Sequence, residues 1–435
     1  MSEGVPAILM FLTVCLVLMA GYPVAFSLGG TALAFAWIGS AFGAFDGVFL
    51  EALPNRLYGI MTNETLVAVP LFVFMGVTLE RARIADELLD TMALLFGRTR
   101  GGLAISVTLV GMLLAASTGI VGATVVTMGL LSLPTMLRRG YDPALACGTI
   151  CASGTLGQII PPSIILIILG DVLGQPVGDL FHAAIIPGVA LVALYVLYIV
   201  GFSIARPAQA PPIPFDDDMS RRYLEALRAI VPPLALIIVV LGSIFAGVAT
   251  PTESSALGGV GALLLAVLYR RCSWRLIQQS AMETVKVTAM VFAILLGATA
   301  FSMVFSYTGG DQVVERLLLQ LPGEQWGFLI FSMLIILVLG FFIDFVEISF
   351  IVVPILAPIA ETLGINMLWF AILIAMNLQT SFLTPPFGFS LFYLKGVAPA
   401  GVTTLDIYRG VVPFIAMQIA ILIVILVFPG LFGLQ

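Results

Sequence analysis

The sequence predicts an all-α polytopic membrane protein that is built from two inverted repeats. Its 435 residues are 60% hydrophobic and only 10% charged, whereas a soluble domain is roughly 45–50% apolar and about 25% charged. Apolar runs of roughly 20 residues, the length that an α-helix needs to cross a bilayer, recur along the chain. The runs are continuous and not alternating, which excludes a transmembrane β-barrel. Two double prolines, in GQIIPPS (157–163) and SFLTPPFG (381–388), interrupt such runs.

Basic residues predict the orientation of the chain, because loops on the cytoplasmic side carry an excess of Lys and Arg. The segment 206–228 begins and ends with Arg, is rich in Pro and Asp, and lacks apolar periodicity, as a linker does. We therefore expect a cytoplasmic linker over 206–228 between a first repeat (1–205) and a second repeat (229–435). The other arginine clusters at the ends of apolar runs lie at 81–83, 97–100, 137–140 and 270–275.

The two halves resemble each other at a constant offset. Pairing Pro161 with Pro385 gives an offset of 224 residues (385 minus 161), and the same offset pairs LPTMLRRGYD with APIAETLGIN. The first of these segments carries cytoplasmic arginines, whereas the span count places its counterpart outside, so the repeats are expected to be inverted. Inverted repeats with paired helix breaks are typical of secondary transporters, which bind substrate and ions near the bilayer midplane.

Each half contains the same order of expected elements after its first scaffold helices. We expect an amphipathic helix, then a segment that leaves one membrane side and returns to it, and then a broken helix. The returning segment is either one re-entrant hairpin or two short spans. The amphipathic helices lie in the interface, where they brace a moving domain as the arms of an elevator-type carrier or serve as ordinary connectors. The arm, hairpin and broken helix span 83–98, 101–138 and 141–174 in the first half, and 311–322, 326–363 and 365–396 in the second.

The double prolines predict ion sites. A proline has no N–H for the carbonyl four residues earlier, so Pro161 is expected to free the carbonyl of Gly157, and Pro385 that of Ser381. An unpaired carbonyl in hydrocarbon costs several kcal/mol and needs another partner. Sodium-coupled carriers use such unwound carbonyls as cation ligands. The alternative is a simple kink in which a neighbouring Ser or Thr satisfies the carbonyl.

Two acidic residues lie near the middle of the second returning segment. Asp344 and Glu347 occur in FFIDFVEIS, and acidic side chains at the depth of the bilayer centre are costly, so they indicate function. Asp344 is expected to be an ion ligand, with a helix cap at the hairpin tip as the alternative.

Several blocks of the chain resemble the large membrane subunit of tripartite ATP-independent periplasmic (TRAP) transporters. They are LRRGYDPALACGTICASGTLGQIIPPS, DLFHAAIIPG and FIDFVEISFIVVPILAPIAETLGI followed by NLQTSFLTPPFGFSLFYLKGVAP. The resemblance implies a sodium-driven elevator carrier in a bacterial inner membrane. It also implies two partners, a small four-helix membrane subunit and a soluble periplasmic binding protein that delivers an organic acid.

The resemblance also implies the ligands of two sodium sites and of the substrate. The first sodium site maps onto Thr118, Gly157, Ile160 and Pro162, and the second onto Asp344, Ser381 and Thr384. The substrate is expected to contact Ser117, Gly119, Thr155, Glu347 and Thr380. Many family members carry Gly-Ser-Ser at the first hairpin tip, whereas here Ile120 and Val121 follow Gly119. A less polar tip indicates a smaller or more apolar acid than a polyhydroxylated sugar acid.

Other functions lack the residues that they need. The chain has one histidine and no HExxH motif or P-loop, so we expect neither an enzyme nor ATP-driven transport. No cofactor, transition metal or nucleic acid is expected, and sodium is the expected coupling ion. The rival function is a self-sufficient symporter of divalent anions, which would share the hairpins and broken helices and need no binding protein.

Overall fold

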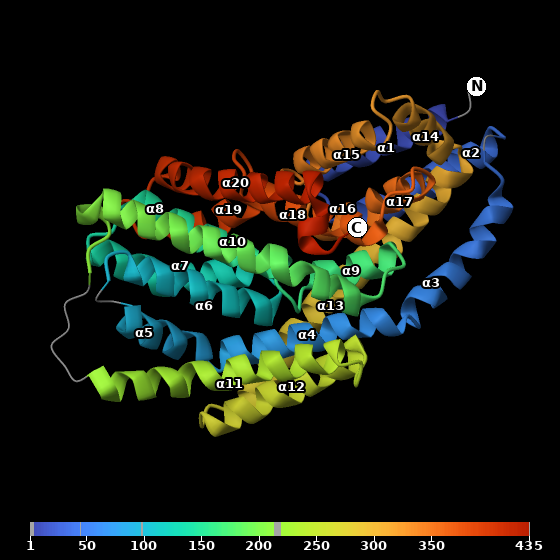
Figure 1. The fold of residues 1–435 in the computed structure, drawn as a ribbon. Coiled ribbons are helices and arrows are strands. Elements are labelled where there is room, and N and C mark those ends of the chain that lie inside the picture. Colours follow the sequence, from blue (N-terminus) through green and yellow to red (C-terminus); the bar gives the residue numbers. More distant parts are fainter. Residues whose placement is uncertain (1–3, 44, 97–98, 213–218, 435) are drawn as a thin grey trace.

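The computed structural model describes residues 4–43, 45–96, 99–212 and 219–434, and the regular elements within these ranges are all helical. Two groups of helices lie side by side (Figure 1). We call one group the scaffold. It consists of α1 (Val5–Met19), α2 (Val24–Ala41), α3 (Leu53–Met61), α4 (Glu64–Arg81), α11 (Met219–Phe245), α12 (Pro251–Leu268) and α13 (Trp274–Tyr307).

We call the other group the core unit. It contains two hairpins, two broken helices and the helix that follows each broken helix. From the first half it contains α6 (Gly102–Thr118), α7 (Val121–Arg138), α8 (Pro143–Thr155), the 3₁₀ turn η2 (Leu156–Gln158), α9 (Ile164–Val172) and α10 (Val177–Ala205). From the second half it contains α15 (Gln325–Leu339), α16 (Phe345–Ile351), α17 (Val353–Thr362), α18 (Met367–Leu383), α19 (Phe389–Val397) and α20 (Thr404–Val427).

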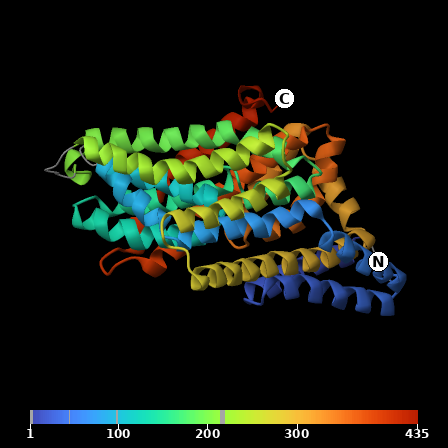
Figure 2. The same ribbon diagram turned by 90° about the horizontal axis from the view of Figure 1, so that it is seen from below.

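The scaffold is held together by close helix contacts. Helix α4 packs against α12 and α13, and α13 packs along α2, as the view from below shows for the gold and dark-blue helices (Figure 2). Gly297 makes the second contact possible, because a Cβ at this position would overlap the carbonyl oxygen of Ala25. Seven described helices are long and apolar enough to cross a membrane, or nine if each of two bent helix pairs is one span. The expected polytopic membrane protein is thus confirmed.

Both returning segments fold as two helices joined by a turn, which we call hairpins; the choice between a re-entrant segment and two short spans stays a prediction. In the first, the two-residue turn Gly119–Ile120 joins α6 to α7, and the backbone N–H of Leu103 donates to the Tyr141 hydroxyl at the open end (3.2 Å). In the second, α15 is followed by a turn and by α16 and α17, which meet at an angle of 49°. Its open end is closed by the Gln325 amide, which donates to the carbonyl of Leu363 (3.1 Å).

Two short helices lie where the arms are expected. Helix α5 (Ile84–Phe96) contacts both α6 of the core unit and α11 of the scaffold, and α14 (Gly310–Leu319) contacts both α17 and α13. The Ser106 hydroxyl of α6 donates to the carbonyl of Met92 in α5 (2.7 Å). Each short helix therefore touches both groups, which is the placement that a brace requires. The inversion of the repeats and the movement of the core unit stay predictions.

The expected linker is partly helical. Its first residues run beside the starts of α6 and α8, because the backbone N–H of Gly101 donates to Ala210 and that of Asp142 donates to Gln209. Residues 213–218 lie outside the described part of the chain. Helix α11 begins at Met219, inside the expected linker, and the boundary between the two repeats stays a prediction. The segment SRRYLEALRAI continues directly into the apolar run, and a helix extends through both.

Candidate functional site

The first break interrupts a buried helix. Asp142 caps α8 by accepting the N–H of Leu145 (2.9 Å), and the helix runs through η2 to the double proline before α9 resumes at Ile164. The carbonyl of Leu156 accepts the N–H groups of Ile159 and Ile160. Among the described residues, none donates to the carbonyl oxygen of Gly157. This agrees with the prediction for Pro161, and it leaves that oxygen available to another partner.

The first hairpin packs directly on this break. A Cβ at Gly157 would overlap the carbonyl oxygen of Ala115 in α6, and a Cβ at Gly119 would lie 3.0 Å from the Ile164 side chain. Gly119 also forms the turn with a φ of 62°, a conformation that residues with a Cβ rarely adopt. The expected neighbours of the first sodium site therefore meet in space, since the hairpin tip and the break are in contact.

The hydroxyl of Thr118 lies at this contact. It donates to the carbonyl of Leu114 (2.9 Å) and lies 2.9 Å from the hydroxyl of Thr124. Its side chain is buried. Thr124 was not among the residues that the sequence indicated, although it contributes a second oxygen beside Thr118.

The second break differs from its expected counterpart in its hydrogen bonds. The backbone N–H of Thr384 donates to the carbonyl of Ser381 (3.2 Å), and the N–H of Gly388 donates to the carbonyl of Thr384 (3.0 Å). The Ser390 hydroxyl donates to the carbonyl of Phe382 (2.9 Å). The prediction that Pro385 leaves the carbonyl of Ser381 without a donor is therefore wrong. The chain forms a tighter turn, in which the N–H of Thr384, one residue before Pro385, donates to this carbonyl.

The second hairpin meets this break as the first hairpin meets its own. A Cβ at Gly340, directly after α15, would overlap the Ser381 hydroxyl, and the rings of Phe345 and Phe382 lie 5.8 Å apart. Asp344 precedes α16 and accepts the N–H of Phe345 (2.7 Å), so its carboxylate caps this helix. The cap that the sequence left as an alternative is present. Capping uses one carboxylate oxygen and leaves lone pairs for a cation, so the ion role stays a prediction.

The five expected substrate ligands do not surround one cavity. Ser117, Thr155 and Thr380 are buried and donate to carbonyls of their own helices. Glu347 is 4% exposed and faces a small crevice beside α1, and its Oε2 has no hydrogen-bond partner among the described residues. Gly119 forms the hairpin turn. The substrate roles of these residues stay predictions.

Two buried glutamines near the breaks were not indicated by the sequence. Gln158 lies within the first break and Gln379 lies two residues before Ser381. Both are almost fully buried, and neither amide group makes a geometrically well-formed hydrogen bond within the described residues. An unpaired amide in an apolar interior is costly. A polar residue inside an apolar run is the sequence signal that could have identified them.

The main cavity lies between the scaffold and the first hairpin. It has a volume of about 1080 Å³. Its inner wall is formed by the start of α7, with Ile120, Gly122 and Ala123, and by Tyr393 of α19. A Cβ at Gly122 would lie 2.9 Å from the Tyr393 ring. The cavity therefore reaches the place where the first hairpin meets the helix that follows the second break.

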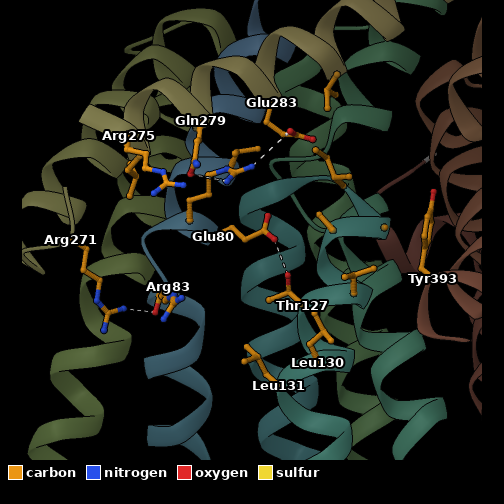
Figure 3. Close-up of a pocket in the computed structure, with 18 of the residues that line it drawn as sticks. Glu80, Arg83, Thr127, Leu130, Leu131, Arg271, Arg275, Gln279, Glu283 and Tyr393 are labelled. Atoms are coloured by element: carbon orange, nitrogen blue, oxygen red, sulfur yellow. Dashed lines mark hydrogen bonds and ion pairs between the residues drawn. The ribbon is translucent and has the colours of Figure 1, made fainter. Parts of the chain in front are cut away.

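Charged side chains line the mouth of this cavity (Figure 3). Arg81 lies 3.2 Å from the amide oxygen of Gln279 and 3.8 Å from the carboxylate of Glu283. Arg271 donates to the carbonyls of Ala82 and Arg83 and so joins the end of α12 to the end of α4. With Arg83 and Arg275, four arginines face two glutamates, Glu80 and Glu283. Arg271 is also paired with Glu87 (3.2 Å), so that four arginines stand against three glutamates. The remaining excess of positive charge favours anions.

The sequence placed these arginines on one side of the membrane but did not bring them to a cavity. They lie at the end of α4 and just after it, and between α12 and the first turn of α13, two regions that are far apart in the chain. Thr127 and Tyr393, which also line the cavity, are single polar residues in apolar runs. They come together because α7 packs against α19 and is hydrogen-bonded through Thr127 to Glu80 of α4.

Residues 10–431 match the family model of the tripartite ATP-independent periplasmic transporter, DctM component. The chain belongs to this family. It is 31% identical to the C4-dicarboxylate TRAP transporter large permease protein DctM of Pseudomonas aeruginosa, over 88% of each chain. It is 29% identical to the sialic acid TRAP transporter large permease protein SiaM of Vibrio cholerae, over 95% of this chain and 94% of that one.

A solved structure shares the fold. The YdaH transporter of Alcanivorax borkumensis matches 99% of both chains with a TM-score of 0.64 at 14% sequence identity. Together with the family match, this shows that the chain is the large membrane permease of a TRAP-type transporter and not an enzyme. A tripartite system contains a binding protein and a second membrane component, so membership favours the binding-protein-dependent function over the self-sufficient symporter.

Proposed function

We propose that this TRAP permease carries out sodium-coupled uptake of a small organic acid across a bacterial inner membrane. The observation that carries the proposal is the arginine-rich cavity, which ends at the first hairpin and at α19. By the positive-inside rule, its mouth faces the cytoplasm. The chain would then be open to the side on which an imported anion is released.

Sodium coupling is supported by the contacts between hairpins and breaks. Each hairpin tip packs against the break in its own half, through Gly157 and Ala115 in one case and through Gly340 and Ser381 in the other. The carbonyl of Gly157 has no donor among the described residues, and the carboxylate of Asp344 lies beside the second break. These are the oxygen ligands that hard cations prefer. We assign one sodium ion to each contact.

The substrate is proposed to lie at the inner wall of the cavity, near Ile120 and Tyr393. The two relatives described above are named for a C4-dicarboxylate and for sialic acid, which are both carboxylates. At the first hairpin tip, Ile120 replaces a hydroxyl with an apolar surface. This favours a small acid with few hydroxyl groups.

The partners are proposed from the tripartite family. A small four-helix membrane subunit would cover part of the lipid-facing scaffold, and a periplasmic binding protein would deliver the acid to the opposite side of the membrane. The short helices α5 and α14, which contact both helix groups, would brace the scaffold while the core unit moves as an elevator.

Reconstitution tests this function. The permease, its small subunit and its binding protein are placed in proteoliposomes, and uptake of radiolabelled C4-dicarboxylates and other small acids is measured. An inward sodium gradient should drive uptake without ATP, and omission of the binding protein should abolish it. Equal uptake in sodium-free buffer under a proton gradient would overturn sodium coupling. Full uptake without the binding protein would instead support the self-sufficient symporter.

A further inference from the structure

Helix α4 of the scaffold makes a polar contact with the core unit at each of its ends. Near its C-terminus, Glu80 accepts a hydrogen bond from the Thr127 hydroxyl of α7 (2.8 Å) (Figure 3). At its N-terminus, the side-chain amide of Asn63 donates to the carboxylate of Asp171 in α9. In the described part of the chain, these two side-chain hydrogen bonds are the ones that join the scaffold to the hairpins and broken helices.

A close backbone contact lies between the two hydrogen bonds. A Cβ at Gly76 of α4 would overlap the carbonyl oxygen of Ser117 at the first hairpin tip. This glycine allows the hairpin to approach the surface of α4 without an interlocking side chain. The tip can therefore slide past this point once the two polar contacts are released.

The two hydrogen bonds lie at opposite ends of the interface between α4 and the core unit, and each borders a cavity. Glu80 and Thr127 line the cavity of about 1080 Å³ on the arginine-rich side. Asp171 lines a cavity of about 190 Å³ at the other end, together with Arg56 of α3 and Ser302 of α13. This interface is thus wide at one end and narrow at the other while both bonds are formed.

We propose that Glu80–Thr127 and Asn63–Asp171 are two latches that hold the permease in the state with the arginine-side cavity open. The proposal rests on the function above, because a latch is needed only if the core unit moves along α4. The bonds are about 25 Å apart along the helix, so they contribute independently to the equilibrium between states. Both must break before the narrow end can open.

The latches can be removed without disturbing the local fold. Thr127→Val keeps the shape of the side chain and removes the donor. Asn63→Ser removes the long amide but keeps a residue that can cap α4, which Asn63 does by accepting the N–H of Thr65 (2.9 Å). The matched control is Thr135→Val, because Thr135 also lies on α7 and is half-buried, but its hydroxyl donates to Leu131 within its own helix.

Cysteine labelling measures the two states without sodium or substrate. In a Cys15→Ser, Cys272→Ser background, Ala123→Cys reports the large cavity and Ser302→Cys reports the small one. The permease is kept with its small subunit in nanodiscs and treated with a methanethiosulfonate reagent. Each latch variant should slow labelling at position 123 and accelerate it at position 302, with a two- to tenfold change in their ratio, roughly the value of one hydrogen bond.

The double variant sharpens the test, since independent bonds predict that the two changes in the ratio multiply. The Thr135→Val control should leave the ratio unchanged. An unchanged ratio in both single variants, or a rise at both positions as in general loosening, would overturn the latches. Failure of sodium coupling in the uptake assay would overturn the proposed function instead, and it would leave this labelling ratio as it is.

Discussion

The double prolines at 161–162 and 385–386 share a motif but lie in different surroundings. The first break is almost entirely buried, beneath the first hairpin and beside Gly188 of α10. The second break opens to the surface at Pro386 and Phe387, and Phe387 is 44% exposed. At the first break the carbonyl of Gly157 has no described donor, whereas at the second the carbonyl of Ser381 accepts the N–H of Thr384.

This difference shows that a proline removes a donor but does not decide whether the freed carbonyl stays free. At the second break the chain tightens by one residue and satisfies the carbonyl locally. For the two proposed sodium sites this predicts a division: the second would rely more on a side chain, the carboxylate of Asp344, whereas the first has no carboxylate among its expected ligands and would rely on backbone oxygens. The following variants test this division between the sites.

The largest effect is expected from Gly157→Ala at the buried break. The added Cβ would overlap a backbone oxygen of α6, and overpacking of this kind typically costs about 1–3 kcal/mol. Thermal unfolding in nanodiscs should show a clear loss of stability, and uptake should be lost. The comparison is Gly388→Ala at the open break, where a Cβ would lie 2.8 Å from the Phe382 carbonyl oxygen, so a smaller loss of stability is expected. Equal losses of stability in the two variants would contradict the inference that the first break is packed more tightly than the second.

Asp344→Asn tests the charge at the second site. Asparagine caps helices as well as aspartate does, so stability should change by less than about 0.5 kcal/mol. Loss of a charge near a cation is expected to raise the half-saturating sodium concentration of uptake at least about tenfold. Sodium titrations of uptake measure this. Parallel losses of stability and transport, with the sodium dependence intact, would leave Asp344 as a cap alone.

Proline replacement compares the two backbones. Pro161→Ala supplies an N–H that can donate to the Gly157 carbonyl. The free energy of unfolding should therefore stay the same or rise by about 0.5–1.5 kcal/mol, the value of the hydrogen bond gained. The Hill coefficient for sodium should fall. Pro385→Ala should lower it less, because the Ser381 carbonyl is already paired. A Hill coefficient that Pro161→Ala does not change would remove backbone ligation as the reason for the first break.

The smallest effects are expected from single hydroxyls. Thr118 is 3% exposed, whereas Thr384 is half-buried at the open break. Thr118→Val should raise the half-saturating sodium concentration by roughly two- to tenfold, the value of one buried polar contact. Thr384→Val should change it less, because water can replace its hydroxyl. Identical shifts in sodium titrations would show that burial does not separate the two sites.

The sequence predicted most elements because their signals are local. The expected arms, hairpins and broken helices agree with α5 and α14, with the two hairpins, and with the helices around each double proline to within a few residues. The helical state of the last linker residues was not predicted, because the polar stretch SRRYLEALRAI forms a helix together with the apolar run that follows it. The prediction for the Ser381 carbonyl was wrong, because the hydrogen bonding of a backbone carbonyl depends on the exact conformation of the turn around it.

The amino-acid sequence alone was enough to predict that this protein crosses the membrane many times, breaks two helices and belongs to a carrier family. Composition, apolar run length and proline chemistry act within a few residues and can be read directly. The packing of the helices was needed to show which side chains meet at the arginine-lined cavity and that α4 contacts the core unit at both ends. These contacts join residues from distant segments, and their geometry depends on how whole helices pack.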